Sequence, residues 1–279
     1  MKYAVSNWIY GNEPLEKSLA RLQRFGYDAV ELTAEAEVHV TRIQNLVGRY
    51  KLRVSNLLGN WSWPLRRDLC NRDPQVRSQA INYAKRAIDL AREFGALSLG
   101  VVPSAVCKPG PLAAREDEIR WAADSIADAG EYAAQLEIYL TIETVNRYEA
   151  YLVNTVDQAL DLISRVGSPY VKLLLDFFHL NIEEPDLILA VFRAGDLIYN
   201  VHAADSNRGA VGNGHTDFKS IVQALKQIQY RHYLTLEPVP READLTNISN
   251  PFSAAGSEAA MDSYAEQSIS LLRLYERLT

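Results

Sequence analysis

The chain has 279 residues, of which 48% are hydrophobic and 23% are charged, as is ordinary for a globular protein with a large core. Its formal net charge is -6 and its basic residues do not cluster, so we expect no nucleic-acid partner. The first residues lead into a polar turn, and no apolar run is long enough to span a bilayer, so we expect no membrane partner.

Two cysteines are present, Cys70 and Cys107, and they do not have the CxxC spacing of a redox or metal motif. This pattern predicts a protein of a reducing compartment, the cytoplasm, without a disulfide framework. Each cysteine is interpreted as a small packing residue and not as a nucleophile.

Short apolar runs alternate with longer segments of helical periodicity in the first half of the chain. The first predicted helix has Asn12 as its N-cap and ends at Gly26, and another begins at Asp73-Pro74 and ends at Gly95. The predicted strands are residues 3–7, 29–32, 52–57 and 97–102.

The second half continues the same alternation. Asn154 is the predicted N-cap of the helix that follows the fifth strand. The predicted strands are residues 139–143, 171–176, 198–204 and 233–237. The predicted helices lie around residues 119–133, 156–163, 187–192, 218–228 and 264–278.

Eight strand–helix units without a linker predict an α/β protein with a parallel sheet, residues 1–279 forming one domain. The strands are continuous apolar runs, as expected when both faces of a sheet are covered. A doubly wound open sheet fits the early units equally well. Eight units that fill the chain favour a closed (β/α)8 barrel, the TIM barrel, with its active site at the C-terminal ends of the strands.

Four of the later predicted strands end in a residue that can bind a metal ion. These residues are Glu143, Asp176, His202 and Glu237. A single carboxylate after a strand is unremarkable, but three at one barrel mouth repel one another unless a cation neutralises them. Oxygen ligands with one imidazole and no thiolate favour one divalent ion, Mn²⁺ first, with Mg²⁺ or Co²⁺ as alternatives.

Several segments of the second half resemble the ketose 3-epimerases of D-tagatose and D-allulose, a branch of the xylose-isomerase-like barrel superfamily. The resemblance is specific in the second half and looser in the first. It lies in residues 142–149 (IETVNRYE), 175–184 (LDFFHLNIEE), 202–208 (HAADSNR), 212–218 (GNGHTDF) and 236–238 (LEP).

The resemblance implies a metal-dependent isomerase that epimerises a free ketose at C3 through a cis-enediolate. It implies that Glu143 and Glu237, besides binding the metal, are the catalytic acid and base. It also implies that Glu149, His179 and Arg208 bind the substrate. From the residues alone, Glu149 fits an ion pair with Arg147 equally well.

Alternative functions use the same site. The first-half loops do not match the expected hexulose pocket, so inosose isomerisation or dehydration and cleavage of a 3-oxo-glycoside remain alternatives. A metal-dependent phosphodiesterase on damaged DNA needs more histidines than the five present. A barrel that only binds sugar is favoured if Glu143 or Glu237 points away from the mouth.

Two loops are further candidates at the mouth. Trp61 and Trp63 follow the third predicted strand, and Trp61 is predicted to pack on the apolar face of a sugar, with a subunit interface as the competing interpretation. Residues 238–261 are predicted to form a lid or a subunit contact because they are long for a connection. The resemblance implies a homodimer or homotetramer.

Overall fold

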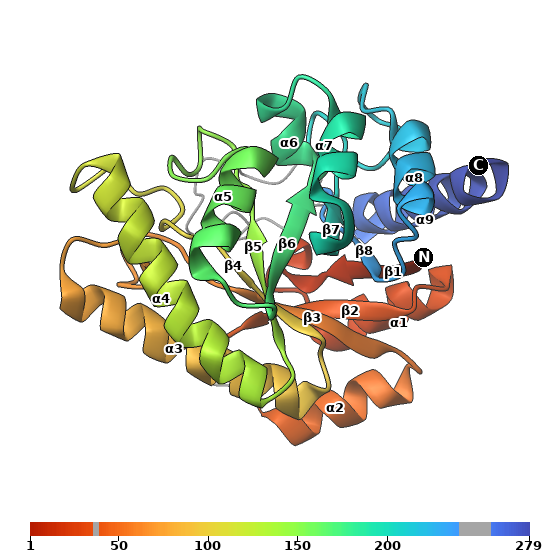
Figure 1. Ribbon diagram of the computed structural model, residues 1–279. Helices are drawn as coiled ribbons and strands as arrows, with labels where there is room; N and C mark the ends of the chain where they lie inside the picture. Colours follow the sequence, from red (N-terminus) through yellow and green to blue (C-terminus); the bar gives the residue numbers. More distant parts are fainter. Residues whose placement is uncertain (36–38, 240–257) are drawn as a thin grey trace.

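The computed structural model describes residues 1–35, 39–239 and 258–279. Its eight strands pair in parallel in sequence order, and β8 pairs with β1 to close a barrel (Figure 1). This confirms the predicted (β/α)8 fold and contradicts the open sheet. The strands are β1 (Lys2–Ser6), β2 (Ala29–Ala34), β3 (Arg53–Gly59), β4 (Ser98–Val101), β5 (Tyr139–Glu143), β6 (Val171–Asp176), β7 (Ile198–Ala203) and β8 (Tyr233–Leu236).

Helices surround the strands, and the C-terminal helix packs beside the first helix and the eighth, which completes the ring (Figure 1). The α-helices are α1 (Leu15–Phe25), α2 (Val40–Arg49), α3 (Pro74–Phe94), α4 (Arg115–Gln135), α5 (Val156–Val166), α6 (Phe177–Glu183), α7 (Leu187–Ala194), α8 (Phe218–Gln227) and α9 (Glu258–Leu278). Two short 3-10 helices, η1 (Asn7–Tyr10) and η2 (Gly195–Leu197), precede α1 and β7.

Helix ends follow the predicted chemistry in part. Asp73 caps α3 by accepting the Gln75 N–H, and Gly26 and Gly95 end their helices in the left-handed conformation. The predicted N-cap at Asn12 is wrong. Pro14 occupies the N-cap position of α1, and this helix has no side-chain cap.

The predicted N-cap at Asn154 is also wrong, by one residue. Thr155 caps α5 in a reciprocal capping box with Gln158. The Asn154 amide donates instead to the carbonyls of Val145 and Ala150, at 2.6 and 2.8 Å. Asn154 therefore fastens the loop after β5 and does not start the helix.

The interior of the barrel contains polar side chains that bridge strands. The Ser98 hydroxyl donates to Asn56 at 2.7 Å between β4 and β3, and the Thr235 hydroxyl donates to Asn200 at 3.3 Å between β8 and β7. The apolar core lies mainly between the strands and the surrounding helices. Buried polar groups of this kind stay stable because each finds a hydrogen-bond partner.

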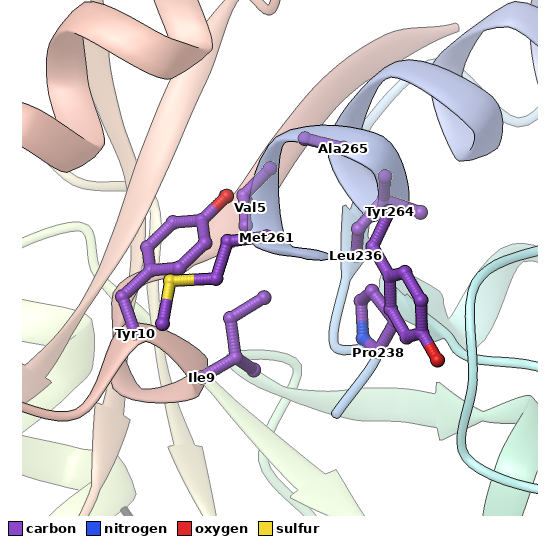
Figure 2. A pocket seen from close by; sticks show the side chains of 8 residues that line it. All are labelled: Val5, Ile9, Tyr10, Leu236, Pro238, Met261, Tyr264 and Ala265. Carbon is purple, nitrogen blue, oxygen red and sulfur yellow. The ribbon is translucent and has the colours of Figure 1, made fainter. Parts of the chain in front are cut away.

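A small apolar pocket lies where α9 packs against β1, η1 and β8 (Figure 2). Leu236 and Pro238, the neighbours of Glu237 in the chain, form part of its lining together with Met261 and Tyr264 from α9. The pocket therefore belongs to the packing that supports the end of β8. Among the helices of the described chain, none has the length and apolar character needed to cross a membrane.

Candidate metal centre and active site

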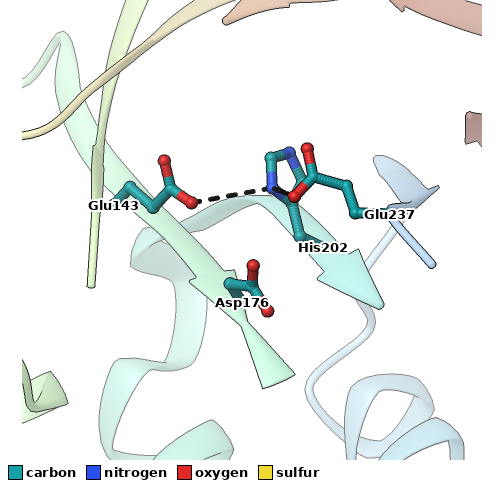
Figure 3. Close-up of side chains that lie close together, drawn as sticks. All are labelled: Glu143, Asp176, His202 and Glu237. Atoms are coloured by element: carbon teal, nitrogen blue, oxygen red, sulfur yellow. Dashed lines mark ion pairs between the residues drawn. The ribbon is translucent and has the colours of Figure 1, made fainter. Parts of the chain in front are cut away.

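The four predicted ligands come together at the C-terminal end of the barrel (Figure 3). One ligand atom from each of Glu143, Asp176, His202 and Glu237 lies within 4.8 Å of the others. All four side chains are buried, with exposed fractions of 6% or less. In Figure 3, Glu143 approaches from one side, His202 and Glu237 from the other, and Asp176 lies between them.

Strand register produces this convergence. Asp176 of β6 pairs directly with His202 of β7, and Glu143 is the last residue of β5. β8 ends at Leu236, one residue earlier than predicted, but the Glu237 N–H still donates to the Ala203 carbonyl and so continues the ladder. The four side chains therefore occupy matching positions at the ends of four consecutive strands, where barrel enzymes place their catalytic groups.

The atoms that face the centre fit a metal ion. Nδ1 of His202 is buried and makes no hydrogen bond to the described residues, yet it lies 3.1 Å from Glu237 Oε2 and 3.8 Å from Glu143 Oε1. An unsatisfied imidazole nitrogen surrounded by carboxylate oxygens is costly in a protein interior, but it matches the donor set of a divalent cation.

Two carboxyl groups of the centre, those of Glu143 and Asp176, have raised pKa values. Burial raises the pKa of Glu143 well above its usual value, and the charge of Glu237 adds to this effect. Burial, followed by the charge of Glu237, raises the pKa of Asp176 to about 6. A bound cation relieves both effects because it stabilises the ionised carboxylates.

Glu237 and His202 are shifted in opposite directions. Burial opposes ionisation of Glu237, but the nearby His202 ring and the hydrogen bond from Trp8 lower its pKa to about 2. Burial likewise opposes the charged form of His202, and the adjacent carboxylates, Glu237 foremost, raise the pKa of this ring well above its usual value. The pair is thus held together by charge.

Asp176 does more than end β6. Its Oδ1 accepts the backbone N–H groups of Phe178 and His179, at 2.8 and 3.4 Å, and so caps α6. This helix, Phe177–Glu183, was not predicted, because a seven-residue segment directly after a strand is too short to show helical periodicity. The cap fixes the orientation of the carboxylate, whose Oδ2 lies 3.5 Å from His179 Nε2.

His179, predicted to bind substrate, is buried beside the centre in a defined tautomer. The Asn146 amide donates to Glu149 at 3.1 Å while its oxygen accepts the Tyr148 N–H at 3.0 Å, which fixes its orientation. Its Nδ2 therefore donates to His179 Nδ1 at 2.7 Å, and the ring hydrogen lies on Nε2. Burial lowers the pKa of His179 to about 4, so the ring is neutral near pH 7.

Arg208 and Glu149, the other predicted substrate-binding residues, form an ion pair at 3.0 Å. The Arg208 guanidinium also lies over the rings of Trp8 and Phe178, at 5.4 and 4.8 Å from their centroids. The alternative pair of Glu149 with Arg147 is wrong, because Arg147 pairs with Glu183 at 2.6 Å.

Trp61 lies in surroundings that differ from the expectation. It is 2% exposed, its indole N–H donates to the Gly100 carbonyl at 3.0 Å, and its ring packs edge-on against Tyr83. These contacts tie the loop after β3 to β4. Substrate contact by Trp61 stays a prediction that its packing does not support. The predicted lid at residues 238–261 falls mostly on residues 240–257, outside the described part of the chain.

Two residues that touch the ligands were missed in the sequence. The indole N–H of Trp8, in η1, donates to Glu237 Oε1 at 2.6 Å. Glu31, in β2, lies 3.1 Å from His202 Nε2. Glu31 could have been noticed in the sequence as a glutamate inside an otherwise apolar predicted strand. No feature of the sequence pattern distinguishes Trp8.

Comparisons with known proteins agree with this geometry. An L-ribulose 3-epimerase from Methylomonas sp. is 34% identical over 84% of this chain and 82% of its own length. A D-psicose 3-epimerase from Enterocloster bolteae is 26% identical over 85% of this chain and 82% of its own.

The structure of a D-allulose 3-epimerase from Methylomonas sp., solved in complex with D-allulose, has a TM-score of 0.87 and 27% identity and covers 99% of this chain and 97% of its own. The model of the xylose isomerase-like TIM barrel family matches residues 19–265. With eight parallel strands closed into a barrel and a cluster of three carboxylates and one imidazole at their ends, the chain belongs to that family.

Proposed function

We propose that the protein catalyses metal-dependent epimerisation of a free ketose at C3. The observation that carries the proposal is the buried cluster of three carboxylates and one imidazole, in which Glu143 and Glu237 face a common space from two sides. The 3-epimerase names of the relatives support the same reaction.

The proposed metal ligands are Glu143, Asp176, Glu237 and the Nδ1 atom of His202. Mn²⁺ is the proposed native ion, with Mg²⁺ and Co²⁺ as alternatives, because the set combines hard oxygen donors with a single imidazole. When bound, the ion supplies Lewis acidity that makes the C–H next to a ketone easier to deprotonate.

Glu143 and Glu237 are the proposed acid and base. One carboxylate removes the C3 proton from one face of the substrate, and the other group delivers a proton to the opposite face, which inverts the centre. The Trp8 N–H holds Oε1 of Glu237, so the position of this carboxylate is fixed before substrate arrives. All four proposed ligands are buried, which shields their carboxylate and imidazole groups from bulk water.

His179 and Arg208 are proposed to hold the oxygens of the substrate. The hydrogen on His179 Nε2 is available as a neutral donor because Asn146 occupies Nδ1. Arg208, held by Glu149 and by the Trp8 and Phe178 rings, presents a fixed cation toward the same space. Glu149 sets the direction of the guanidinium and is itself a proposed acceptor for a substrate hydroxyl.

A substrate panel tests the proposed function. Protein stripped of metal and reloaded with Mn²⁺ is incubated with ketopentoses, ketohexoses, inososes and 3-oxo-glycosides, and products are identified by ¹³C NMR. We expect metal-dependent formation of the C3 epimer of at least one ketose, lost in Glu237→Gln and retained in the exposed control Glu116→Gln. Dehydration of an inosose or cleavage of a glycoside without any C3 epimer contradicts the proposal and favours the alternatives.

We also propose a homodimer or homotetramer in the cytoplasm. The exposed apolar side chains of Leu189 and Phe192 on α7 support an interface, and the unpaired thiols of Cys70 and Cys107 fit a reducing compartment. Light scattering of the purified protein tests the oligomer, and a monomeric mass contradicts it.

A further inference from the structure

Glu31 is a charged residue at the centre of the barrel, with no exposed surface. Its strand, β2, is separated from β7 by β1 and β8, yet its carboxylate reaches two side chains of β7 across the interior. Oε1 and Oε2 lie 3.1 and 3.2 Å from His202 Nε2, and Oε2 accepts the Asn200 amide at 2.9 Å. A buried carboxyl group is costly in such a place unless polar side chains contact it.

This contact bears on which nitrogen of the His202 ring carries a hydrogen. The Asn200 amide already donates to Oε2, and both oxygens of Glu31 lie beside Nε2 as acceptors, so the hydrogen bond between Glu31 and the ring forms with Nε2 as its donor. The neutral ring then has its lone pair on Nδ1, the atom that faces Glu237 at 3.1 Å and Glu143 at 3.8 Å.

Asn200 is compatible with the opposite tautomer of His202, in which Nε2 carries no hydrogen. Its Nδ2 lies 3.3 Å from His202 Nε2 and can donate to that nitrogen when it carries no hydrogen. The Asn200 oxygen accepts from the Val201 N–H and the Thr235 hydroxyl, which directs Nδ2 toward Glu31 and His202. Of the described side chains beside Nε2, the carboxylate of Glu31 is therefore the one that selects the tautomer with its hydrogen on Nε2.

We propose that Glu31 is a positioning residue that keeps the ring hydrogen of His202 on Nε2 and thereby leaves Nδ1 free to bind the divalent cation. The proposal rests on the metal centre described under the proposed function. A carboxylate behind a ligating histidine both orients the ring and makes its other nitrogen a better donor to the metal.

The variant Glu31→Gln tests the proposal with little change in shape. A glutamine can turn its NH₂ toward Nε2, where it joins Asn200 as a second donor and favours the tautomer with hydrogen on Nδ1. We expect Mn²⁺ to bind about 10- to 100-fold more weakly, as is typical when the partner of a ligating histidine is removed. Binding is measured from free Mn²⁺ by electron paramagnetic resonance, without substrate.

Thr235→Val is the matched control for damage to the barrel interior. It removes a hydrogen bond to Asn200 in the same layer and leaves the contacts of Glu31 in place. We expect this variant to lose some thermal stability and to bind Mn²⁺ as the unmodified protein does. An equal loss of affinity in both variants would show a general packing effect and overturn the proposal.

A measurement on the unmodified protein keeps the proposal testable if Glu31→Gln does not fold. ¹⁵N NMR of the Mg²⁺-loaded protein is expected to show the His202 hydrogen on Nε2, and a hydrogen on Nδ1 overturns the proposal. Normal Mn²⁺ affinity in a folded Glu31→Gln variant also overturns it. Because these readouts need no sugar, a protein with the expected tautomer and affinity that epimerises no ketose contradicts the proposed function alone.

Discussion

The two halves of the barrel contribute to the site in different ways. The strands β5 to β8 end in the four residues that can bind a metal, whereas the first half supplies residues that hold those ligands: Trp8 against Glu237 and Glu31 against His202. The comparison shows that the four side chains predicted from the strand ends contact partners that lie elsewhere in the barrel. We therefore expect the loss of a proposed metal ligand in the second half to reduce activity more than the loss of a contacting residue in the first half.

The largest expected effect is in the second half. Glu237→Gln keeps the size of the side chain but removes a proposed acid/base group, so kcat should fall by about 10² to 10⁴. The variant should still bind some metal through the three remaining ligands. Proton exchange at the substrate carbon at the unmodified rate would remove Glu237 from the mechanism.

A large effect on stability is expected in the first half. Lys108, in the loop after β4, is buried and pairs with Asp68 at 2.8 Å and with Glu118 at 3.5 Å, both also buried. Lys108→Met leaves two buried carboxylates without their cation, which should lower the free energy of unfolding by about 3 to 5 kcal/mol. Urea denaturation measures the loss.

The matched control for Lys108→Met is Arg165→Met, which breaks exposed pairs with Glu116 and Asp161. It should lower the free energy of unfolding far less than Lys108→Met does, because water screens exposed charges. An equal loss of unfolding free energy in the two variants would contradict the view that the buried ion pairs of Lys108 stabilise the first-half loops.

An intermediate effect is expected where the halves meet. Trp8→Phe removes the N–H that binds Glu237 and keeps an aromatic ring beside Arg208. Activity or metal affinity should fall by about 10- to 100-fold, less than for Glu237→Gln. Trp121→Phe, on the outer helix α4, serves as the control. Equal activity and metal affinity in the Trp8 and Trp121 variants would contradict a role of Trp8 in positioning Glu237.

The smallest effect concerns the contact of α1 with α9. Arg21 bridges Glu13 and Asp262 at 2.6 Å each. Burial opposes ionisation of Glu13, but hydrogen bonds from Arg21 and Ser18 lower its pKa below the usual 4.5. A carboxyl with a lowered pKa stabilises the fold above its unfolded value, and this contribution is lost as the pH falls from about 4.5 through the lower folded value.

Thermal unfolding of Glu13→Gln checks this pH dependence. The variant should melt below the unmodified protein at neutral pH, and the gap should close as the solution is acidified. A gap that stays constant down to acid pH would mean that the contact of Glu13 does not depend on its charge.

The sequence was enough to predict the barrel and the clustering of four potential metal ligands at its mouth, because both rest on repeating patterns. Glu143, Asp176 and His202 each follow an apolar run, and strand ends converge in any closed parallel barrel. Glu31 was not predicted, because its role depends on a contact between strands that are not neighbours.

Local details escaped prediction for other reasons. Thr155 in place of Asn154 as the cap of α5 reflects a choice between adjacent residues of similar capping ability. The burial of Trp61 depends on its fit against Gly100 in β4 and Tyr83 in α3, which are both distant from it in the chain. Such tertiary contacts leave no periodic signal in the chain.

The most direct test of the account is deuterium incorporation followed by NMR. The metal-free protein is reloaded with Mn²⁺ for turnover or Mg²⁺ for sharp spectra and incubated in D₂O with ketoses that differ in configuration. The account predicts metal-dependent label at C3 together with the new epimer. Label only at another carbon, or none with any ketose, would contradict C3 epimerisation by this site.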